Sequence, residues 1–309
     1  MQSTTRAHLQ IHFCVLLWGF TAILGKLITL PAAQLVWWRM LLVMLALLTV
    51  PRVWRGLRAM SARLLWAYAG IGVLVAMHWL TWYAAIKLSN ASVGATCMAL
   101  APVFMALIEP WVAKRRFDPR ELLVGAAVVP GVAMVVGGVP ADMRLGLALG
   151  VLSAVFVALF GSLNKRFVEH GDPLAVTFVE LGTGALFITL LMPLLPHQGA
   201  IYALPSVHDA WLLVVLAFGC TLLPFALALV ALRQLSAFTT QMITNLEPVY
   251  AIVLAIVLLH EQHELDAWFY AGVVVILGAV FAHPLLGRLQ RKPKRPEVLG
   301  TAESHAVVD

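Results

Sequence analysis

Charged residues are scarce in this chain of 309 residues. They make up 12% of the sequence, hydrophobic residues make up 61%, and the mean hydropathy is +0.91. Soluble domains contain about 25% charged residues. A chain with so little charge cannot hide its apolar side chains in one water-soluble core, so the composition predicts an integral membrane protein.

Cysteine and acidic residues are also few. Cys14, Cys97 and Cys220 lie in apolar runs without a CxxC spacing, so we expect buried thiols rather than a disulfide or a metal site. The 15 acidic residues are scattered. No Walker motif, no GxGxxG at a strand–helix junction and no paired carboxylates occur, which argues against ATP hydrolysis and against an enzyme. We expect no cofactor, no metal and no nucleic-acid partner.

Long apolar runs recur along the whole chain. A membrane-spanning helix needs about 20 mainly apolar residues. An all-α protein with ten transmembrane helices is predicted, with boundaries near 9–29, 32–50, 64–85, 90–111, 121–139, 145–164, 173–195, 209–231, 236–259 and 267–286. A β-barrel is excluded, because its strands alternate apolar and polar residues over about ten positions. We expect the first run to remain as a span, since no cleavage pattern follows it.

One apolar segment occurs twice. Residues 85–104 read AIKLSNASVGATCMALAPVF, residues 231–250 read ALRQLSAFTTQMITNLEPVY, and the two align without a gap at a shift of 146 positions. The shift places Pro102 on Pro248. Because each half has an odd number of spans, the second half must cross the membrane upside down relative to the first. Two inverted five-helix repeats with corresponding prolines are typical of secondary transporters and point to the binding site.

The predicted domains are a first repeat at 9–139, a second, inverted repeat at 145–286 and a basic tail at 287–309, which we expect to be disordered. With the N-terminus in the cytoplasm, 17 of the 21 Lys and Arg residues fall on the cytoplasmic side. The positive-inside rule therefore predicts that both termini are cytoplasmic. We expect the basic residues beside the membrane to meet anionic lipid rather than nucleic acid.

Several short motifs follow one another in a defined order. They are LWGFTAILGKL at 17–27, Arg39 after Pro31, the segment 95–102, NLEP at 245–248 and LLHE at 258–261. Together they resemble the drug/metabolite transporter superfamily, specifically its EamA-type permeases. The resemblance implies that the protein exports or exchanges small metabolites, such as amino acids, across the bacterial inner membrane.

The family often ends its fourth and ninth helices with a Gly-Glu-like pair. Glu261 fits the glutamate of the pair at the end of the ninth helix, but the corresponding residue at the end of the fourth helix is Arg115. The sequence therefore leaves open whether two glutamates share a role.

Glu247 is the sharpest candidate for a functional residue, because charges inside spans tend to face a cavity or a partner. It lies near the midplane of the predicted ninth span, directly before Pro248, which leaves the carbonyl of Thr244 without its usual partner. Glu247, Thr244 and Asn245 could form a polar notch that holds a substrate amine or binds a proton. The alternative is a glutamate packed against a neighbouring helix. Pro102 and Pro248 are predicted to mark the helix breaks beside the cavity.

Aromatic side chains provide a second group of candidates. Trp18, His78, Trp82 and Tyr83 are predicted to line the cavity and to stack on an aromatic or cationic substrate. Interfacial anchoring and core packing are the alternative.

Other charged residues are predicted to have structural or gating roles. For Arg39 and Glu180, bonding between helices is favoured over substrate contact. Lys26 could pair with an anionic group or extend to the interface. The segment HEQHE at 260–264 differs from HExxH and favours a solvated loop over a metal site.

The leading interpretation is a secondary transporter in the bacterial inner membrane with a small-molecule substrate. Proton coupling and the oligomeric state stay open. The alternatives are a membrane-embedded enzyme of lipid metabolism, which would need clustered His, Asp or metal ligands at one face, and a flippase for lipid-linked metabolites or a structural subunit.

Overall fold

A computed structural model of the chain describes residues 2–112, 114, 116–117, 119–195, 200–244 and 246–289, and these residues contain helices and no strands. The helices of the first half are α1 (Gln2–Leu27), α2 (Ala32–Leu48), α3 (Pro51–Ala59), α4 (Ala62–Leu88), α5 (Ala91–Met98), α6 (Ala101–Val112) and α7 (Pro119–Gly138). Those of the second half are α8 (Arg144–Phe167), α9 (Pro173–Leu191), α10 (Val207–Val214), α11 (Leu223–Leu232), α12 (Ala237–Thr244), α13 (Glu247–Leu254) and α14 (Ala267–Leu289). A π-helical segment, Val215–Leu222, joins α10 to α11, and another, Ala255–Leu259, extends α13.

Six helical segments within the described ranges are long and apolar enough to cross a membrane, and the bent pair α2–α3 makes a seventh if it counts as one span. The chain is therefore a multi-pass membrane protein. Two shorter apolar helices, Glu247–Leu259 and Ala267–Ala279, follow. A helical segment occupies each of the ten predicted runs.

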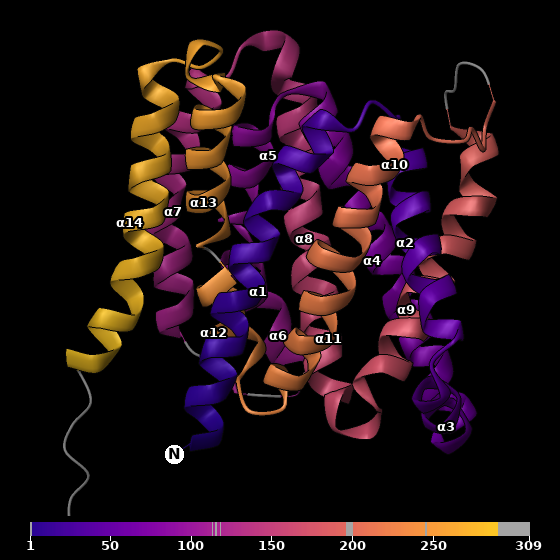
Figure 1. Ribbon diagram of the computed structural model, residues 1–309. Helices are drawn as coiled ribbons and strands as arrows, with labels where there is room; N and C mark the ends of the chain where they lie inside the picture. The colour runs from indigo at the N-terminus through magenta and orange to yellow at the C-terminus, as the bar shows by residue number, and fades with distance from the viewer. Residues whose placement is uncertain are drawn as a thin grey trace, which may run out of the picture.

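The long helices stand side by side in one bundle (Figure 1). We call the end at which α1 begins the N-terminal end and the opposite end the far end. Helix α1 runs from the N-terminal end to the far end, and α8, the first helix of the second half, runs back (Figure 1). Helix α14 finishes at the N-terminal end. Residues 290–309 of the predicted tail lie outside the described residues, so its disorder stays a prediction.

Small residues allow the helix backbones to approach. Helices α7 and α14 cross at Gly131 and Gly272, where a Cβ atom on Gly131 would lie 2.8 Å from the carbonyl oxygen of Gly272. A side chain at either position would push the helices apart. Such close crossings are typical of helices packed in a membrane, where van der Waals contact rather than water exclusion holds them together.

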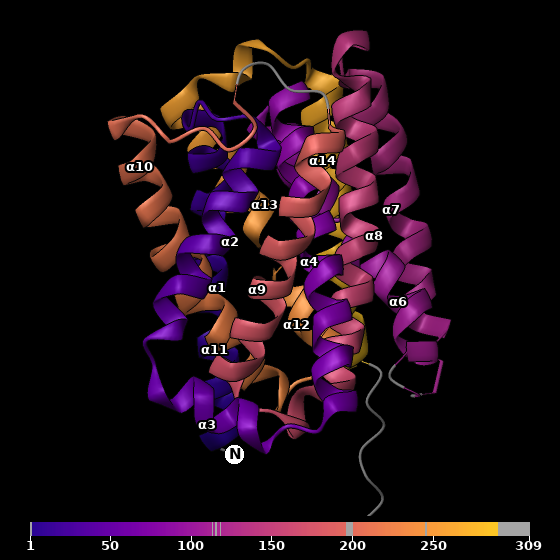
Figure 2. The ribbon, with the colours of Figure 1, turned by 90° about the vertical axis from the view of Figure 1, so that its right-hand side faces the viewer.

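Helix α3 was not predicted from the sequence. It bends by 90° from the axis of α2 and lies at the N-terminal end of the bundle in both views (Figures 1 and 2). The stretch 51–63 contains four arginines and lies between two predicted spans. Pro51 takes the first position of a helix, where its missing N–H and fixed φ are favourable.

Candidate functional site

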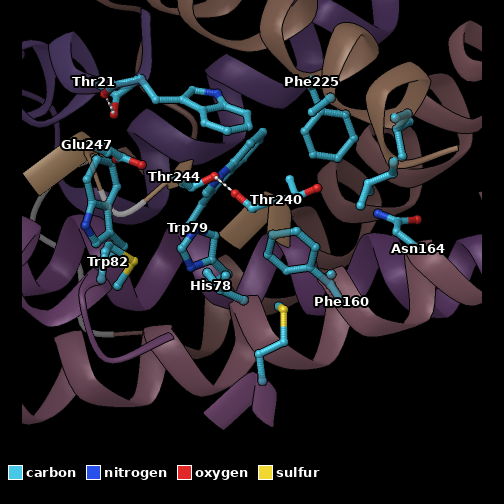
Figure 3. A pocket seen from close by; sticks show the side chains of 18 of the residues that line it. Thr21, His78, Trp79, Trp82, Phe160, Asn164, Phe225, Thr240, Thr244 and Glu247 are labelled. Carbon is cyan, nitrogen blue, oxygen red and sulfur yellow. Dashed lines mark hydrogen bonds between the residues drawn. The ribbon is translucent and has the colours of Figure 1, made fainter. Parts of the chain in front are cut away.

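A cavity lies between helices of both halves. Its volume is ≈ 130 Å³, about ten times the space that one water molecule needs by the same measure. Its walls come from α1, α2, α4, α5 and α6 of the first half and from α8, α11, α12 and α13 of the second. Glu247 and Trp82 lie toward one end of the cavity and Asn164 toward the other (Figure 3).

Five of the residues predicted to form the site line this cavity: Trp18, His78, Trp82, Thr244 and Glu247. They belong to four helices, α1, α4, α12 and α13, that are distant in sequence. The fold therefore brings the aromatic group and the polar group of candidates to one place.

Both prolines of the repeat stand next to helix breaks. Helix α5 ends at Met98, a turn follows at Ala99 and Leu100, and Pro102 is the second residue of α6. In the second half, α12 ends at Thr244 and Pro248 is the second residue of α13. Each break borders the cavity, because Met98 and Met105 line it in the first half, and Thr244 and Glu247 do so in the second.

Glu247 is the first residue of α13, so the helix break places its carboxylate at the cavity wall. The carboxylate accepts no hydrogen bond from any residue that the structure describes. Thr244 Oγ1 donates to the carbonyl of Thr240 at 3.0 Å instead. Asn245 lies outside the described residues, and its part in the notch stays a prediction. A carboxylate without a protein donor can accept hydrogen bonds from a ligand.

Arg39 is 2% exposed and also lines the cavity. Its Nε donates to Thr221 Oγ1 at 2.5 Å, Nη1 to the Tyr83 hydroxyl at 2.8 Å and Nη2 to the Cys220 carbonyl at 3.3 Å. The guanidinium carbon lies 3.8 Å from the centre of the Trp79 ring, at a cation–π distance. The bonds to Thr221 and Cys220 join α2 to the second half, and the bond to Tyr83 joins it to α4. These acceptors are neutral, and Arg39 forms no ion pair with a carboxylate of the residues that the structure describes.

One face of α4 is formed by aromatic side chains. His78 and Trp82, four residues apart, stack with ring centres 6.4 Å apart, and His78 Nδ1 hydrogen-bonds Ser153 Oγ of α8 at 2.7 Å. Trp82 Nε1 is buried without a partner in the part of the chain that the structure describes. Tyr83 does not line the cavity. It is fully buried beside Trp82, with ring centres 4.9 Å apart, and its hydroxyl supports Arg39.

The interpretation of HEQHE as a solvated loop was wrong for Glu261, which is fully buried. Its carboxylate accepts bonds from the Ala91 N–H at 3.0 Å, the Ser92 N–H at 2.9 Å and Ser92 Oγ at 2.8 Å. These groups form the N-terminus of α5, where unpaired N–H groups and the helix dipole attract an anion. Among the described residues, no group of three His, Cys, Asp or Glu could hold a metal ion.

A second glutamate performs the same task at the other end of the bundle. Glu109 of α6 is buried, and its Oε2 accepts a bond from the N–H of Phe238, near the start of α12, at 3.1 Å. The first half therefore also contributes a helix-capping glutamate, although it is not at the position that aligns with Glu261, which is Arg115 and lies outside the described residues. The sequence alignment missed it because Glu109 is earlier in its span than Glu261.

Lys26 and Glu180 do not line the cavity. Glu180 is fully buried on α9, and its Oε2 lies 3.5 Å from Nδ2 of Asn164, which does line it. Glu180 Oε1 has no partner among the residues described. Lys26 is partly exposed near the far end of α1.

Several cavity residues were missed by the sequence reasoning: Thr21, Phe160, Asn164, Phe225 and Thr240. Phe160 and Asn164 stand four apart on α8, so they share a face. An amide in an apolar span is a polar signal comparable to a charge. Asn164 could therefore have been predicted from the sequence, as an amide within the apolar span 145–164.

The EamA-like transporter family matches the chain over residues 5–137 and 144–282. Two Bacillus subtilis (strain 168) proteins are similar to it. The uncharacterized transporter YyaM is 23% identical over 180 residues, which are 56% of this chain and 58% of YyaM. The uncharacterized transporter YetK is 28% identical over 159 residues, 51% of this chain and 45% of YetK. The chain thus spans about half the length of these curated relatives. One solved crystal structure has a similar fold, with a TM-score of 0.66 and 16% identity over 93% of this chain and 99% of that one.

Proposed function

The chain belongs to the EamA-like transporter family, and we propose that this membrane transporter is a secondary transporter that exports or exchanges small metabolites such as amino acids across a bacterial inner membrane. The observation that carries the proposal is the cavity, which contains one buried cation, Arg39, and one carboxylate, Glu247, from opposite halves of the chain. A transporter that alternates between two openings needs a site to which both halves contribute.

Opposite charges in one cavity favour a substrate that carries both charges. Arg39 and Glu247 interact electrostatically but form no ion pair with each other. Arg39 has five N–H donors, of which three hydrogen-bond to neutral groups. A substrate carboxylate near Arg39 and an ammonium group near Glu247 would satisfy both residues at once.

The rest of the cavity suits an apolar substrate body. Trp18, Phe160 and Phe225 contribute aromatic surface. Ligand sites are commonly apolar with a few polar groups that fix the orientation of the ligand. Amino acids with an apolar side chain have this combination of features.

The proposed mechanism is alternating access. We propose that all ten helical segments cross the membrane, that the halves are inverted repeats of 9–139 and 145–286, and that both chain ends are cytoplasmic. Glu261 caps α5 near the far end, and Glu109 caps α12 near the N-terminal end. Because each contact joins the two halves, loosening one while the other persists would open the cavity to one side at a time.

The energy source is proposed to be a gradient of the substrate or of protons. Glu247 is the group in the cavity that could exchange a proton for a substrate ammonium group, because both compete for the same carboxylate. His78 Nδ1 hydrogen-bonds Ser153 Oγ, so this ring nitrogen is less available for the same role.

The proposal is tested with the purified full-length chain in liposomes. Uptake of a panel of radiolabelled amino acids would be compared with that of empty liposomes. For a transported amino acid, the matched amide and the matched deaminated acid then test the two charges separately. Transport of the amino acid above that of both analogues is expected. If no amino acid or other small metabolite in the panel moves faster than into empty liposomes, the proposal fails.

A further inference from the structure

Helix α3 begins a strongly basic segment at the N-terminal end of the bundle. Residues 51–66 read PRVWRGLRAMSARLLW, with four arginines and no acidic residue. This segment lies outside the cavity, and transport as proposed above does not use it. Its charge therefore needs a separate physical explanation.

The arginines of α3 share one face of the helix. Arg52, Arg55 and Arg58 are spaced three apart, and all three are exposed. Helix α3 makes an angle of 90° with α2. With α2 crossing the membrane, as proposed above, the 90° bend would place α3 parallel to the membrane surface, at the level of the lipid headgroups.

The opposite face of α3 packs against α9, so the helix cannot turn its arginines toward the protein. Val53 is fully buried. A Cβ atom on Gly56 would lie 2.6 Å from the Cβ of Ala175, so only glycine permits this approach. The orientation of the basic face is thereby set by packing.

Most of the charge on this face is not neutralised by the protein. Arg52 Nε donates to Asp172 Oδ2 at 2.7 Å. Asp172 Oδ1 also caps α9, accepting from the Leu174 N–H at 3.0 Å, so this carboxylate is fully engaged. Arg55 and Arg58 form no ion pair within the described ranges.

Two tryptophans on the same segment are placed as interfacial anchors. Trp54 is 43% exposed and Trp66 is 79% exposed. Trp54 Nε1 donates to the Leu48 carbonyl at 2.9 Å, which satisfies the polar atom of this half-exposed side chain. Exposed Trp side chains concentrate at the level of the headgroups in membrane proteins.

We propose that the arginine face of α3, formed by Arg52, Arg55 and Arg58, binds the headgroups of anionic phospholipids in the adjacent leaflet. Guanidinium groups recognise phosphate through paired N–H donors. Arg52 and Arg55 also border a hollow in the surface whose other walls are Gly56 and Asp172. Because α3 belongs to the first half and Asp172 caps α9 of the second, a lipid bound in this hollow would lie where the two halves meet.

The test uses the full-length protein purified in a neutral detergent. Native mass spectrometry would count bound phosphatidylglycerol and phosphatidylcholine with identical acyl chains. The variant Arg55→Gln/Arg58→Gln removes two unpaired charges from α3. The control Arg6→Gln/Arg144→Gln removes the same number of charges from exposed positions on α1 and α8. The variant Arg55→Lys/Arg58→Lys changes the same two side chains but keeps their charge. It separates the loss of charge from damage to the fold.

The α3 variant is expected to weaken phosphatidylglycerol binding by about thirtyfold, which corresponds to ~1 kcal/mol for each arginine. The control should stay near wild type, and the lysine variant should keep most of the affinity. Equal binding of the two lipids, or an unchanged affinity of the α3 variant, would overturn the proposal. So would equally tight binding of inorganic phosphate or of a short oligonucleotide, since the face would then be a general anion site.

Discussion

Lys87 and Arg233, which stand 146 positions apart and align in the repeat, make equivalent hydrogen bonds beyond the ends of α1 and α8, two helices that run in opposite directions (Figure 1). Lys87 lies in the last turn of α4 and donates through Nζ to the carbonyl of Ile28, just after α1. Arg233 follows α11 and donates through Nη2 to the carbonyl of Gly171 at 2.6 Å, just after α8. Each basic side chain therefore connects the third predicted span of its half, which ends with α4 or α11, to the end of the first span, α1 or α8.

Further hydrogen bonds join the two halves at each end of the bundle. At the far end, Asp209 accepts bonds from the Thr29 N–H at 2.9 Å and Thr29 Oγ1 at 2.7 Å. At the N-terminal end, the Tyr68 hydroxyl donates to the Phe167 carbonyl at 2.7 Å. Both ends carry polar contacts that opening and closing would have to rearrange.

The topology can be tested by labelling single cysteines in right-side-out membranes. The native thiols at Cys14, Cys97 and Cys220 are buried and would be replaced first. Arg144→Cys and His263→Cys are expected to react with an impermeant reagent from outside, and Arg116→Cys and Arg166→Cys only from inside. This pattern follows from the basic asymmetry of the chain. One position that labels from the opposite side would refute the ten-span arrangement.

Glu247→Gln is expected to lower transport by about tenfold or more, because a hydrogen bond to a charged group contributes about 1.5–3 kcal/mol. Gln keeps the shape of Glu but cannot ionise, so any pH dependence that comes from this carboxylate should disappear. Uptake into liposomes across a pH series measures both effects. Thr81→Val is a control on α4, since Thr81 does not line the cavity and its hydroxyl bonds the helix backbone. Unchanged rates and pH dependence would reduce Glu247 to a packing residue.

Arg39→Lys should impair transport although the charge is kept. Lysine cannot reproduce the forked bonds to Thr221, Tyr83 and Cys220 or the stacking on Trp79. Tyr83→Phe removes one of these bonds and should cause a smaller loss. Rates measured for an amino acid and its amide show whether Arg39 recognises the carboxylate. Equal losses for both substrates would indicate a structural role alone.

Glu261→Ala should destabilise the fold by about 2–4 kcal/mol, because it leaves the first N–H groups of α5 buried without an acceptor. Glu261→Gln keeps one acceptor oxygen and should have a smaller effect. Thermal unfolding in detergent, followed by intrinsic fluorescence, shows which of the two variants is less stable. Gln262→Ala is a control from the same turn, and an Ala variant at 261 as stable as this control would contradict the capping role.

The repeated segment and the long apolar runs could be read directly from the sequence. A membrane imposes about 20 apolar residues on every crossing helix, so the runs that contain α4 and α8 were visible without coordinates. The breaks next to Pro102 and Pro248 were equally accessible, because proline lacks the N–H that a continuous helix needs. Glu247 was recognisable because a charged residue in the middle of an apolar span is rare.

Which side chains meet was decided by the tertiary structure. The spans are apolar on all sides, so hydropathy does not determine how each helix is rotated or which helix lies beside it. For this reason Asn164 and Phe225 were missed as cavity residues and Tyr83 was included, although it lies behind Trp82. Glu261 was read as a loop residue because its partners at Ala91 and Ser92 are about 170 positions away in sequence and adjacent only in the folded bundle.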